Sequence, residues 1–175
     1  MKNAKATKLQ LFKLFDELGI KATTHNHRQV FTVEEGQDIK AQIAGGHSKN
    51  LFLKDKDGAF YLICALGETQ IKLNQTHKAI GAARLSFGSE ESLWDILGVK
   101  PGSVTLFALI NDTEHKINLV IDKALFDCEI VNFHPLLNDA TCSIRHDEMM
   151  LFIAWWGGKM QIADFSQEVP IIVPK

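Results

Sequence analysis

The feature that most constrains the fold is a tight turn between two apolar segments. Residues 48–54 and 59–66 are rich in apolar side chains, and Lys56-Asp57-Gly58 lies between them. An Asp-Gly pair supplies the positive φ that a short hairpin turn requires. The sequence therefore predicts an antiparallel hairpin, and with it a sheet, in the first half of the chain.

The other apolar patterns predict further strands and helices around this hairpin. Helices are expected at residues 3–18 before Gly19, at Thr32–Glu35 as a short capped turn, at 74–80, at 90–97 between Ser89 and Gly98, and at 147–156 before Gly157-Gly158. Strands are expected at residues 21–27, 104–110, 117–121, 128–133 and 160–165. Residues 169–175, which contain Pro170 and Pro174, are expected to be loosely held.

These expectations define the fold class and the domain organisation. Strands outnumber helices and tight turns join several of them, which favours an α+β (mixed α/β) fold with a largely antiparallel mixed sheet surrounded by helices. No internal repeat or linker divides the chain, so residues 1–175 are expected to form one domain. The N-terminus lacks the continuous apolar region of a signal peptide, and no stretch is apolar enough to span a membrane, so a cytoplasmic location is expected.

Cysteine usage and short motifs exclude several classes of site. Cys64, Cys128 and Cys142 are odd in number and form no CxxC pair, which argues against a disulfide framework and a thiolate zinc site. The chain has no GxSxG, HExxH, P-loop or GxGxxG motif. His25 and His27 stand two residues apart on a predicted strand, but no third and fourth metal ligands follow, and an exposed sheet face explains them better. These observations argue against a metal site.

The charge balance limits the nucleic-acid partners. The formal net charge of −2 argues against a broad basic surface, and we expect no DNA partner and no membrane partner. An RNA substrate held by a local basic patch remains compatible with this charge.

Three segments combine features that suggest a binding site. Residues 45–53 place two glycines before a strand that carries Lys49, and glycines permit close approach of a ligand to the backbone. Residues 100–105 form a Pro-Gly turn whose free backbone N–H groups could bind an anion. In residues 133–138, His134 ends a strand just before proline. Taken singly, each segment is better explained as a structural loop; together they predict a site with a cation, backbone donors and an imidazole.

The same segments resemble a known family. GGHSKNLFLKD, RLSFGSEESLWDILGVKPGSVTLFALIND and NFHPLLNDAT are similar to successive blocks of the YbaK/prolyl-tRNA editing-domain superfamily, and most of all to its freestanding alanyl-tRNA(Pro) deacylases, the PrdX or ProXp-ala type. The similarity extends from the first helix to the strand that ends at Phe165. Its specificity lies in the order of the blocks, since no single block is distinctive.

The resemblance implies a deacylase that acts in trans on mischarged tRNA without a metal or organic cofactor. It assigns the family's functional lysine to Lys49, its GxxxP loop to Gly102–Leu106 and its functional histidine to His134. The chain departs from the family at Leu106, where the loop ordinarily has proline, and this departure bears on the preferred amino acid more than on the reaction.

From these positions we derive the expected roles. Lys49, Gly102 and His134 are the expected catalytic residues, and Lys54 and Lys56 are the expected tRNA-binding residues. The expected partners are the acceptor end of mischarged tRNA(Pro) and prolyl-tRNA synthetase. The expected substrate-binding residues are Phe31, Asn50, Ser103, Val104, Thr105 and Leu106.

The reaction and its alternatives follow from the chemistry of the substrate. An aminoacyl ester is activated, so positioning of a water and stabilisation of an oxyanion can suffice for its hydrolysis. We expect release of alanine from Ala-tRNA(Pro). Two alternatives stay open: deacylation of Cys-, Ser- or Thr-tRNA, and a non-catalytic module that binds tRNA or a synthetase.

Overall fold

The computed structural model of the protein describes residues 4–32 and 34–174. Its strands are β1 (Thr23–Asn26), β2 (Gly46–Asp55), β3 (Phe60–Leu66), β4 (Leu85–Phe87), β5 (Ile117–Asp122), β6 (Ile130–Phe133), β7 (Ala140–Arg145), β8 (Lys159–Asp164) and β9 (Ile171–Val173). Its helices are α1 (Lys8–Leu18), α2 (Gln37–Gln42), α3 (Leu73–Ile80), α4 (Glu90–Leu97), the 3₁₀ helix η1 (Leu106–Asn111), α5 (Lys123–Phe126) and α6 (His146–Trp156).

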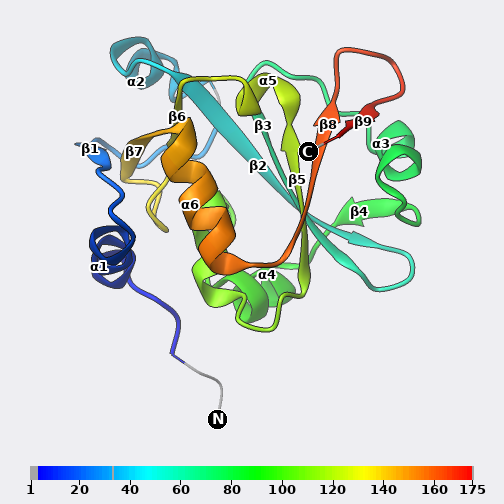
Figure 1. Ribbon diagram of the computed structural model, residues 1–175, viewed down its shortest axis with the longest axis horizontal. Coiled ribbons are helices and arrows are strands. Elements are labelled where there is room, and N and C mark those ends of the chain that lie inside the picture. Colours follow the sequence, from blue (N-terminus) through cyan, green and yellow to red (C-terminus); the bar gives the residue numbers. More distant parts are fainter. Residues whose placement is uncertain (1–3, 33, 175) are drawn as a thin grey trace.

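The strands form one mixed sheet, as the sequence predicts. Eight of its nine described strands follow the order β1-β7-β6-β2-β3-β5-β8-β9, and the ninth, β4, pairs with β2 beside this path (Figure 1). The pairs β1/β7, β6/β7, β2/β3, β2/β4 and β8/β9 are antiparallel, whereas β2/β6, β3/β5 and β5/β8 are parallel. The α+β fold with a largely antiparallel mixed sheet is therefore confirmed.

The predicted hairpin lies near the middle of this sheet. Strands β2 and β3 pair from Ser48 opposite Leu66 to Lys54 opposite Phe60. The Asp55 carboxylate closes the turn by accepting hydrogen bonds from the Asp57 and Ala59 backbone N–H groups, at 3.0 and 2.9 Å. The hairpin prediction is confirmed, and it places the opposite end of β2 beside β6.

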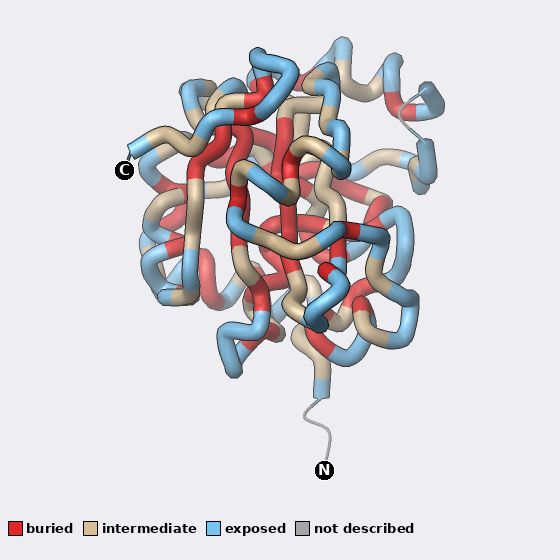
Figure 2. Tube along the Cα trace, turned by 90° about the vertical axis from the view of Figure 1, so that its right-hand side faces the viewer, coloured by how far each residue is buried: buried red, intermediate tan, exposed pale blue. Residues whose placement is uncertain are grey.

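The two faces of the sheet are covered by different helices. Alternate side chains of a strand point to opposite faces, so Leu62 and Cys64 pack in the core with α1, α4, α6 and η1. Tyr61 and Ile63 pack in a second, smaller core with α3. Figure 2 shows the buried residues concentrated in the central strands and the exposed residues on the surrounding loops. Among the helices that the structure describes, none is both long and apolar enough to cross a membrane.

Helix ends follow the predicted caps, with one correction. Helix α1 begins at Lys8, several residues later than expected. Thr7 caps it, because the Thr7 side chain accepts a hydrogen bond from the Gln10 N–H and the Gln10 side chain accepts one from the Thr7 N–H. The expected start at Asn3 lies outside the described residues. Gly19 ends the helix in the left-handed conformation, as predicted.

Two further predictions are wrong. The apolar run 104–110 contains the 3₁₀ helix η1 instead of a strand. Thr105 caps η1 by accepting from the Phe107 N–H, and hydrophobic periodicity cannot separate a fully buried helix from a buried strand. Residues 169–175 are not loosely held along their described length, because β9 pairs with β8 from Ile171 to Val173.

The short elements were the hardest to predict. Thr32 accepts a hydrogen bond from the Glu35 N–H at 3.2 Å, but this forms a turn and the helix begins only at Gln37. Strands β4, β7 and β9 and helices α2 and α5 were not predicted. Their apolar signals are too brief to stand out, and β7 is interleaved with polar residues.

Candidate active site

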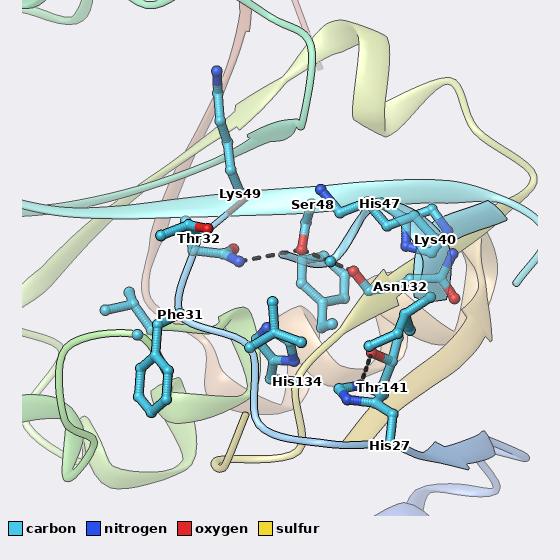
Figure 3. Close-up of a pocket in the computed structure, with 17 residues that line it drawn as sticks. His27, Phe31, Thr32, Lys40, His47, Ser48, Lys49, Asn132, His134 and Thr141 are labelled. Carbon is cyan, nitrogen blue, oxygen red and sulfur yellow. Dashed lines mark hydrogen bonds between the residues drawn. The ribbon is translucent and has the colours of Figure 1, made fainter. Parts of the chain in front are cut away.

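A cavity of about 220 Å³ opens where the first residues of β2 meet β6 and the segment 27–40 (Figure 3). It lies on the face of the sheet that α1, α4 and α6 cover, because Ser48 and Asn50 alternate with Lys49 along β2 and share a face with the buried Phe52. Its lining residues are His27, Val30, Phe31, Thr32, Gly36, Ile39, Lys40, His47, Ser48, Lys49, Asn50, Gly102, Val104, Asn132, Phe133, His134 and Thr141.

The segment 27–31 is anchored to the loop that follows His134. The His27 N–H donates to the Asp139 carbonyl at 3.0 Å. The Val30 N–H donates to the Asn138 carbonyl at 3.3 Å, and the Asn138 side chain returns a bond to the Val30 carbonyl at 2.9 Å. These bonds hold one wall of the cavity in place beside His134.

A second set of contacts ties this wall to α2. Arg28 forms a bidentate pair with the Asp38 carboxylate at 2.8 and 2.9 Å and donates to the Glu35 carbonyl. The Glu35 carboxylate in turn accepts from the Phe31 N–H at 3.1 Å. The Arg28–Asp38 pair raises the pKa of Arg28 and lowers the pKa of Asp38, through a side-chain hydrogen bond in both cases. Because both side chains are exposed, the pair contributes little to stability and mainly sets the position of α2.

His134 presents a free nitrogen lone pair to the cavity. Its Nδ1 lies 2.9 Å from the Ala140 carbonyl, which can only accept, so Nδ1 carries the proton. Burial lowers the pKa of His134 below the 6.5 of an ordinary histidine, and the nearby His27 and Lys40 lower it further. The ring is therefore neutral at pH 7, and Nε2 is an acceptor.

His27 lies against His134 and was not predicted at this site. The two rings are 6.3 Å apart, and the His27 Nε2 lies 2.9 Å from the Thr141 hydroxyl. His27 Nδ1 lies 2.7 Å from the Arg28 carbonyl, which can only accept, so Nδ1 is the donor in this contact. The interpretation of His27 as a residue on an exposed face is wrong, because the chain turns after Asn26 and directs this ring into the cavity.

A chain of hydrogen bonds along β2 ends in an unpaired acceptor. The Ser48 hydroxyl donates to the Asn132 carbonyl at 2.8 Å, and the Asn50 side-chain amide donates to the Ser48 oxygen at 3.1 Å. The Asn50 Oδ1 is buried and has no hydrogen-bond partner among the described residues. A buried acceptor without a donor costs free energy, and in a cavity it is suited to a ligand donor.

Lys49 lines the cavity with part of its side chain, but its ammonium points away from His134 (Figure 3). The ammonium donates to the Thr69 carbonyl on the other side of β2. Burial lowers the pKa of Lys49, while the negative charge of Asp122 opposes this shift. Lys49, Gly102 and His134 thus line one cavity, yet the cation of the predicted trio is directed elsewhere.

Gly45 and Gly46, at the start of β2, are required by close packing within the protein and do not make room for a ligand. A Cβ on Gly46 would lie 2.6 Å from the Cys128 sulfur, and one on Gly45 would lie 2.7 Å from the Ile130 side chain. Gly45 also has a φ of +104°. These two positions are glycine because β2 and the segment 128–131 pack closely, which corrects the expectation from the sequence.

The predicted Gly102–Leu106 loop divides between cavity and core. Gly102, with φ +88°, and Val104 line the cavity. Ser103 does not line it, and its N–H is already bonded to the Lys100 carbonyl at 3.0 Å, so the expected anion-binding donor is occupied. Thr105 and Leu106 are fully buried outside the cavity, where Leu106 belongs to the main core.

The remaining predicted residues lie at the mouth of the cavity or outside it. Phe31 is 63% exposed, and its ring lies 3.2 Å from where a Cβ on Gly102 would be. Lys54 and Lys56 are exposed at the hairpin end of β2, and the nearer one is about 13 Å along the strand from Asn50. The structure does not bring these two lysines to the cavity.

Several residues that line the cavity lie inside the sequence segments that were predicted to form the site, although they were not predicted as site residues themselves. His47 and Ser48 directly precede Lys49, and Asn132 lies two residues before His134, inside segments that were already singled out. Burial lowers the pKa of His47, whose Nε2 donates to the Ile43 carbonyl at 2.8 Å. Ile39 and Lys40 had no such signal, because they lie on a six-residue helix that was not predicted.

The sequence matches a known family over most of its length. Residues 27–152 match the family profile of the aminoacyl-tRNA editing domain. The chain is 35% identical over 135 residues to the prolyl-tRNA editing protein ProX of Acetoanaerobium sticklandii, covering 77% of this chain and 82% of that one. It is 33% identical over 146 residues to prolyl-tRNA synthetase associated domain-containing protein 1 of Danio rerio, covering 82% of this chain and 79% of that one.

Solved structures share the fold at low sequence identity. A crystal structure described as a candidate trans-editing enzyme for prolyl tRNA synthetase superposes with a TM-score of 0.69 at 15% identity, covering 94% of this chain and 99% of that one. The hypothetical protein APE2540 superposes with a TM-score of 0.69 at 19% identity, covering 92% of this chain and 100% of that one. At such identities the likeness concerns the fold alone.

Proposed function

The chain belongs to the aminoacyl-tRNA editing domain family, and on that premise we propose that it hydrolyses alanine from mischarged proline tRNA in trans. The proposal assigns residues 1–175 to one deacylase domain. The observation that carries it is one small cavity lined both by a neutral imidazole, His134, and by Asn50, whose buried Oδ1 has no hydrogen-bond partner among the described residues.

The size of the cavity supports a small aminoacyl group. About 220 Å³ is below the range of about 300–1,000 Å³ that is typical of sites for larger ligands. Val30, Ile39 and Val104 give it apolar walls that suit a methyl side chain. A synthetase site built for proline discriminates poorly against alanine, because each missing methylene is worth only about 1–3 kcal/mol. A second site that excludes proline by its size corrects this error.

The polar groups of the cavity support hydrolysis without a nucleophilic side chain. His134 Nε2 accepts a hydrogen bond from the amino group of the substrate, and Asn50 Oδ1 accepts one from a ribose hydroxyl. A water attacks the ester carbonyl, the bond between that carbon and the ribose oxygen breaks, and the proton from the water passes through the neighbouring ribose hydroxyl to the departing oxygen. The residues thus act mainly by holding the reacting atoms in place.

The partners follow from the same proposal. The substrate is the acceptor end of tRNA(Pro), and no cofactor takes part in the steps above. ProX is named a prolyl-tRNA editing protein, and the Danio rerio relative is named for an association with prolyl-tRNA synthetase. We extend both names to this chain as proposals, with the synthetase as a protein partner.

The test is a panel of aminoacyl-tRNAs incubated with the purified protein, with release of free amino acid followed over time. Release from Ala-tRNA(Pro), and not from Pro-tRNA(Pro), is the expected result. Release only from Cys-, Ser- or Thr-tRNA would replace the substrate and keep the reaction. Binding of tRNA without release from any substrate would refute catalysis and leave a binding module.

Two variants test the assigned residues. We expect His134→Ala to lower kcat/KM by about 100-fold, the loss that a misplacement of the reacting atoms by about 1 Å can cause. Lys49→Ala is expected to lower it less, because the Lys49 ammonium contacts Thr69. Lys159→Ala, on an exposed part of β8, is the control. Parental rates in both His134→Ala and Lys49→Ala would refute the assignment.

A further inference from the structure

We propose that Asn132 is a positioning residue, which joins β6 to the beginning of β2 and so fixes which end of the Asn50 amide is left as a free acceptor. The inference rests on the proposed function, in which the Asn50 Oδ1 accepts a hydrogen bond from a ribose hydroxyl. Asn132 is 2% exposed, lines the cavity and lies two residues before His134. It is not among the residues that the sequence predicts for the site.

The junction between β6 and β2 is short and lies beside the cavity. In the described part of the chain, the two strands pair only over two residues each, 46–47 with 131–132. Along the sheet, this junction connects β1, β7 and β6 to the remaining strands. His134 follows β6 on one side of the junction, and Asn50 belongs to β2 on the other. The relative position of these two site residues therefore depends on the junction.

The side chain of Asn132 reinforces the junction. Its Nδ2 donates to the Ala44 carbonyl at 3.1 Å and to the Gly46 carbonyl at 3.3 Å, in the segment that leads into β2. The Ser143 hydroxyl, on β7, donates to the Asn132 Oδ1 and holds the amide with its donor end towards β2. An alanine at this position would leave both carbonyls without this donor.

The backbone carbonyl of Asn132 begins a short relay of hydrogen bonds to Asn50. This carbonyl accepts the hydroxyl proton of Ser48 at 2.8 Å (Figure 3), so the Ser48 oxygen can offer only lone pairs to the next group. The Asn50 amide nitrogen donates to that oxygen at 3.1 Å. The bond occupies the donor end of the Asn50 amide and leaves Oδ1 as the end without a partner among the described residues.

The relay decides what the Asn50 amide can bind. If the Ser48 hydroxyl were free to donate elsewhere, it could bond to Oδ1, and the amide would turn over and present its NH2 group instead. An acceptor binds the hydrogen of a ribose hydroxyl and leaves the lone pairs of that hydroxyl free, whereas an NH2 group would occupy one of them. Asn132 needs no contact of its own with the substrate in this scheme, because it acts through Ser48 and Asn50.

The experiment is a double-mutant cycle between Asn132 and Asn50, measured as kcat/KM on alanyl-tRNA(Pro). Asn132→Ala alone is expected to lower kcat/KM about tenfold, the loss expected of Asn50→Ala, because both changes remove the same acceptor. In the Asn50→Ala background, Asn132→Ala should cost less than about twofold, since no acceptor is left to position. Independent losses would multiply to about 100-fold, and this outcome would overturn the inference.

Two further variants separate positioning from stability. Ser48→Ala interrupts the relay without changing the Asn132 side chain and should also lower kcat/KM about tenfold. The matched control is Asn118→Ala on β5, whose side-chain amide donates to the Phe60 carbonyl at 3.0 Å between another pair of strands. It should destabilise the protein against urea much as Asn132→Ala does, yet keep kcat/KM within about twofold. Parental activity in Ser48→Ala, or an equal loss of activity in Asn118→Ala, would overturn the inference.

Binding of a stable analogue distinguishes this inference from the proposed reaction. The probe is adenosine that carries alanine on its ribose through an amide in place of the ester and keeps the neighbouring hydroxyl. If the parent binds the probe but hydrolyses no aminoacyl-tRNA, the proposed function fails, and a Kd about tenfold weaker in Asn132→Ala, with no further loss on adding Asn50→Ala, still supports the inference.

The remaining outcomes decide against the inference. If the parent hydrolyses alanyl-tRNA(Pro) and Asn132→Ala reacts at the parental rate, the proposed function stands and the positioning role is refuted. A parent protein that neither hydrolyses the ester nor binds the probe would refute both.

Discussion

The two ends of β2 use buried polar groups in opposite ways. At the hairpin end, the Asp55 carboxylate accepts hydrogen bonds from the backbone N–H groups of Asp57, Ala59 and Ala83, at 3.0, 2.9 and 3.1 Å. At the cavity end, the Asn50 Oδ1 has no partner among the described residues. A satisfied buried group stabilises the fold, whereas an unsatisfied one beside a cavity is available to a ligand.

The difference indicates where function resides on the strand. The hairpin end fixes the register of β2 against β3, in which Lys54 lies opposite Phe60. The cavity end carries Ser48 and Asn50 next to His134, a buried imidazole that stays neutral at pH 7. Changes at the hairpin end should therefore act on stability, and changes at the cavity end on activity.

The largest expected effect is at the hairpin end. Asp55→Ala leaves three backbone N–H groups without their acceptor, and loss of hydrogen bonds to a charged group should lower the free energy of unfolding by about 3 kcal/mol. Urea denaturation measures this change. Asp57→Ala, on the exposed turn, should stay within about 0.5 kcal/mol. An Asp55→Ala protein that is as stable as the parent but inactive would reverse the comparison.

Gly46→Ala is expected to show that the cavity end also has a structural component. Its Cβ would lie 2.6 Å from the Cys128 sulfur, and overpacking of this kind costs about 1–3 kcal/mol of unfolding free energy. Combining it with Cys128→Ala removes the sulfur and should restore part of the loss, as a double-mutant cycle measures. If Gly46→Ala instead lowers activity at full stability, the glycine does serve the ligand.

Asn50→Ala should separate activity from stability at the cavity end. Loss of an acceptor for the substrate is expected to lower kcat/KM about tenfold, equivalent to about 1.4 kcal/mol. The free energy of unfolding should change by less than about 1 kcal/mol, since an unsatisfied buried acceptor is removed together with one neutral hydrogen bond. A variant that unfolds more readily and reacts at the parental rate would place Asn50 with Asp55 among the structural groups.

The smallest effect concerns the pH dependence of the reaction. Burial lowers the pKa of His134 below 6.5, so the ring gains its proton, and Nε2 loses its lone pair, only at more acidic pH than an ordinary histidine. The acid limb of the pH profile of kcat/KM, which reports the pKa values of the free protein, should therefore lie below pH 6.5. The Lys40 charge also lowers this pKa, so Lys40→Ala should shift the limb towards higher pH. A limb that is unchanged in Lys40→Ala would show that the two groups do not interact in solution.

The same pKa shift has a consequence for stability. The unfolded chain binds a proton at an ordinary histidine pKa, whereas the folded His134 resists protonation. The protein should lose stability as the pH falls through about 6.5, because protons then favour the unfolded state. Urea titrations at several pH values measure this loss, and it should be smaller in His134→Asn.

Much of the fold could be predicted from local patterns. The Asp57-Gly58 turn, the Ser89 and Gly98 caps and the apolar periodicity of α1 each act within a few residues, so their effects are visible in the sequence. The run 104–110 was assigned wrongly because full burial removes the periodicity that distinguishes a helix from a strand. Strand β7 was missed because its pairing with β1 and β6 defines it more than its own composition does.

The site was predictable only in part, for a similar reason. Gly102 and His134 line the cavity, as do Phe31, Asn50 and Val104, whereas Ser103, Thr105 and Leu106 lie outside it. A motif marks a stretch of chain, but the backbone of that stretch, here a turn at Gly102 that leads into η1, decides which of its members face the cavity.

The sequence by itself determined the family, the mixed sheet and the segments that surround the cavity, because these depend on residue types and on contacts close along the chain. Only the tertiary structure decided that the Lys49 ammonium contacts Thr69 while His134 lines the cavity, and that Gly45 and Gly46 are required by the packing of the segment 128–131. These outcomes depend on groups that are far apart in the sequence, and their positions follow from the packing of the whole sheet.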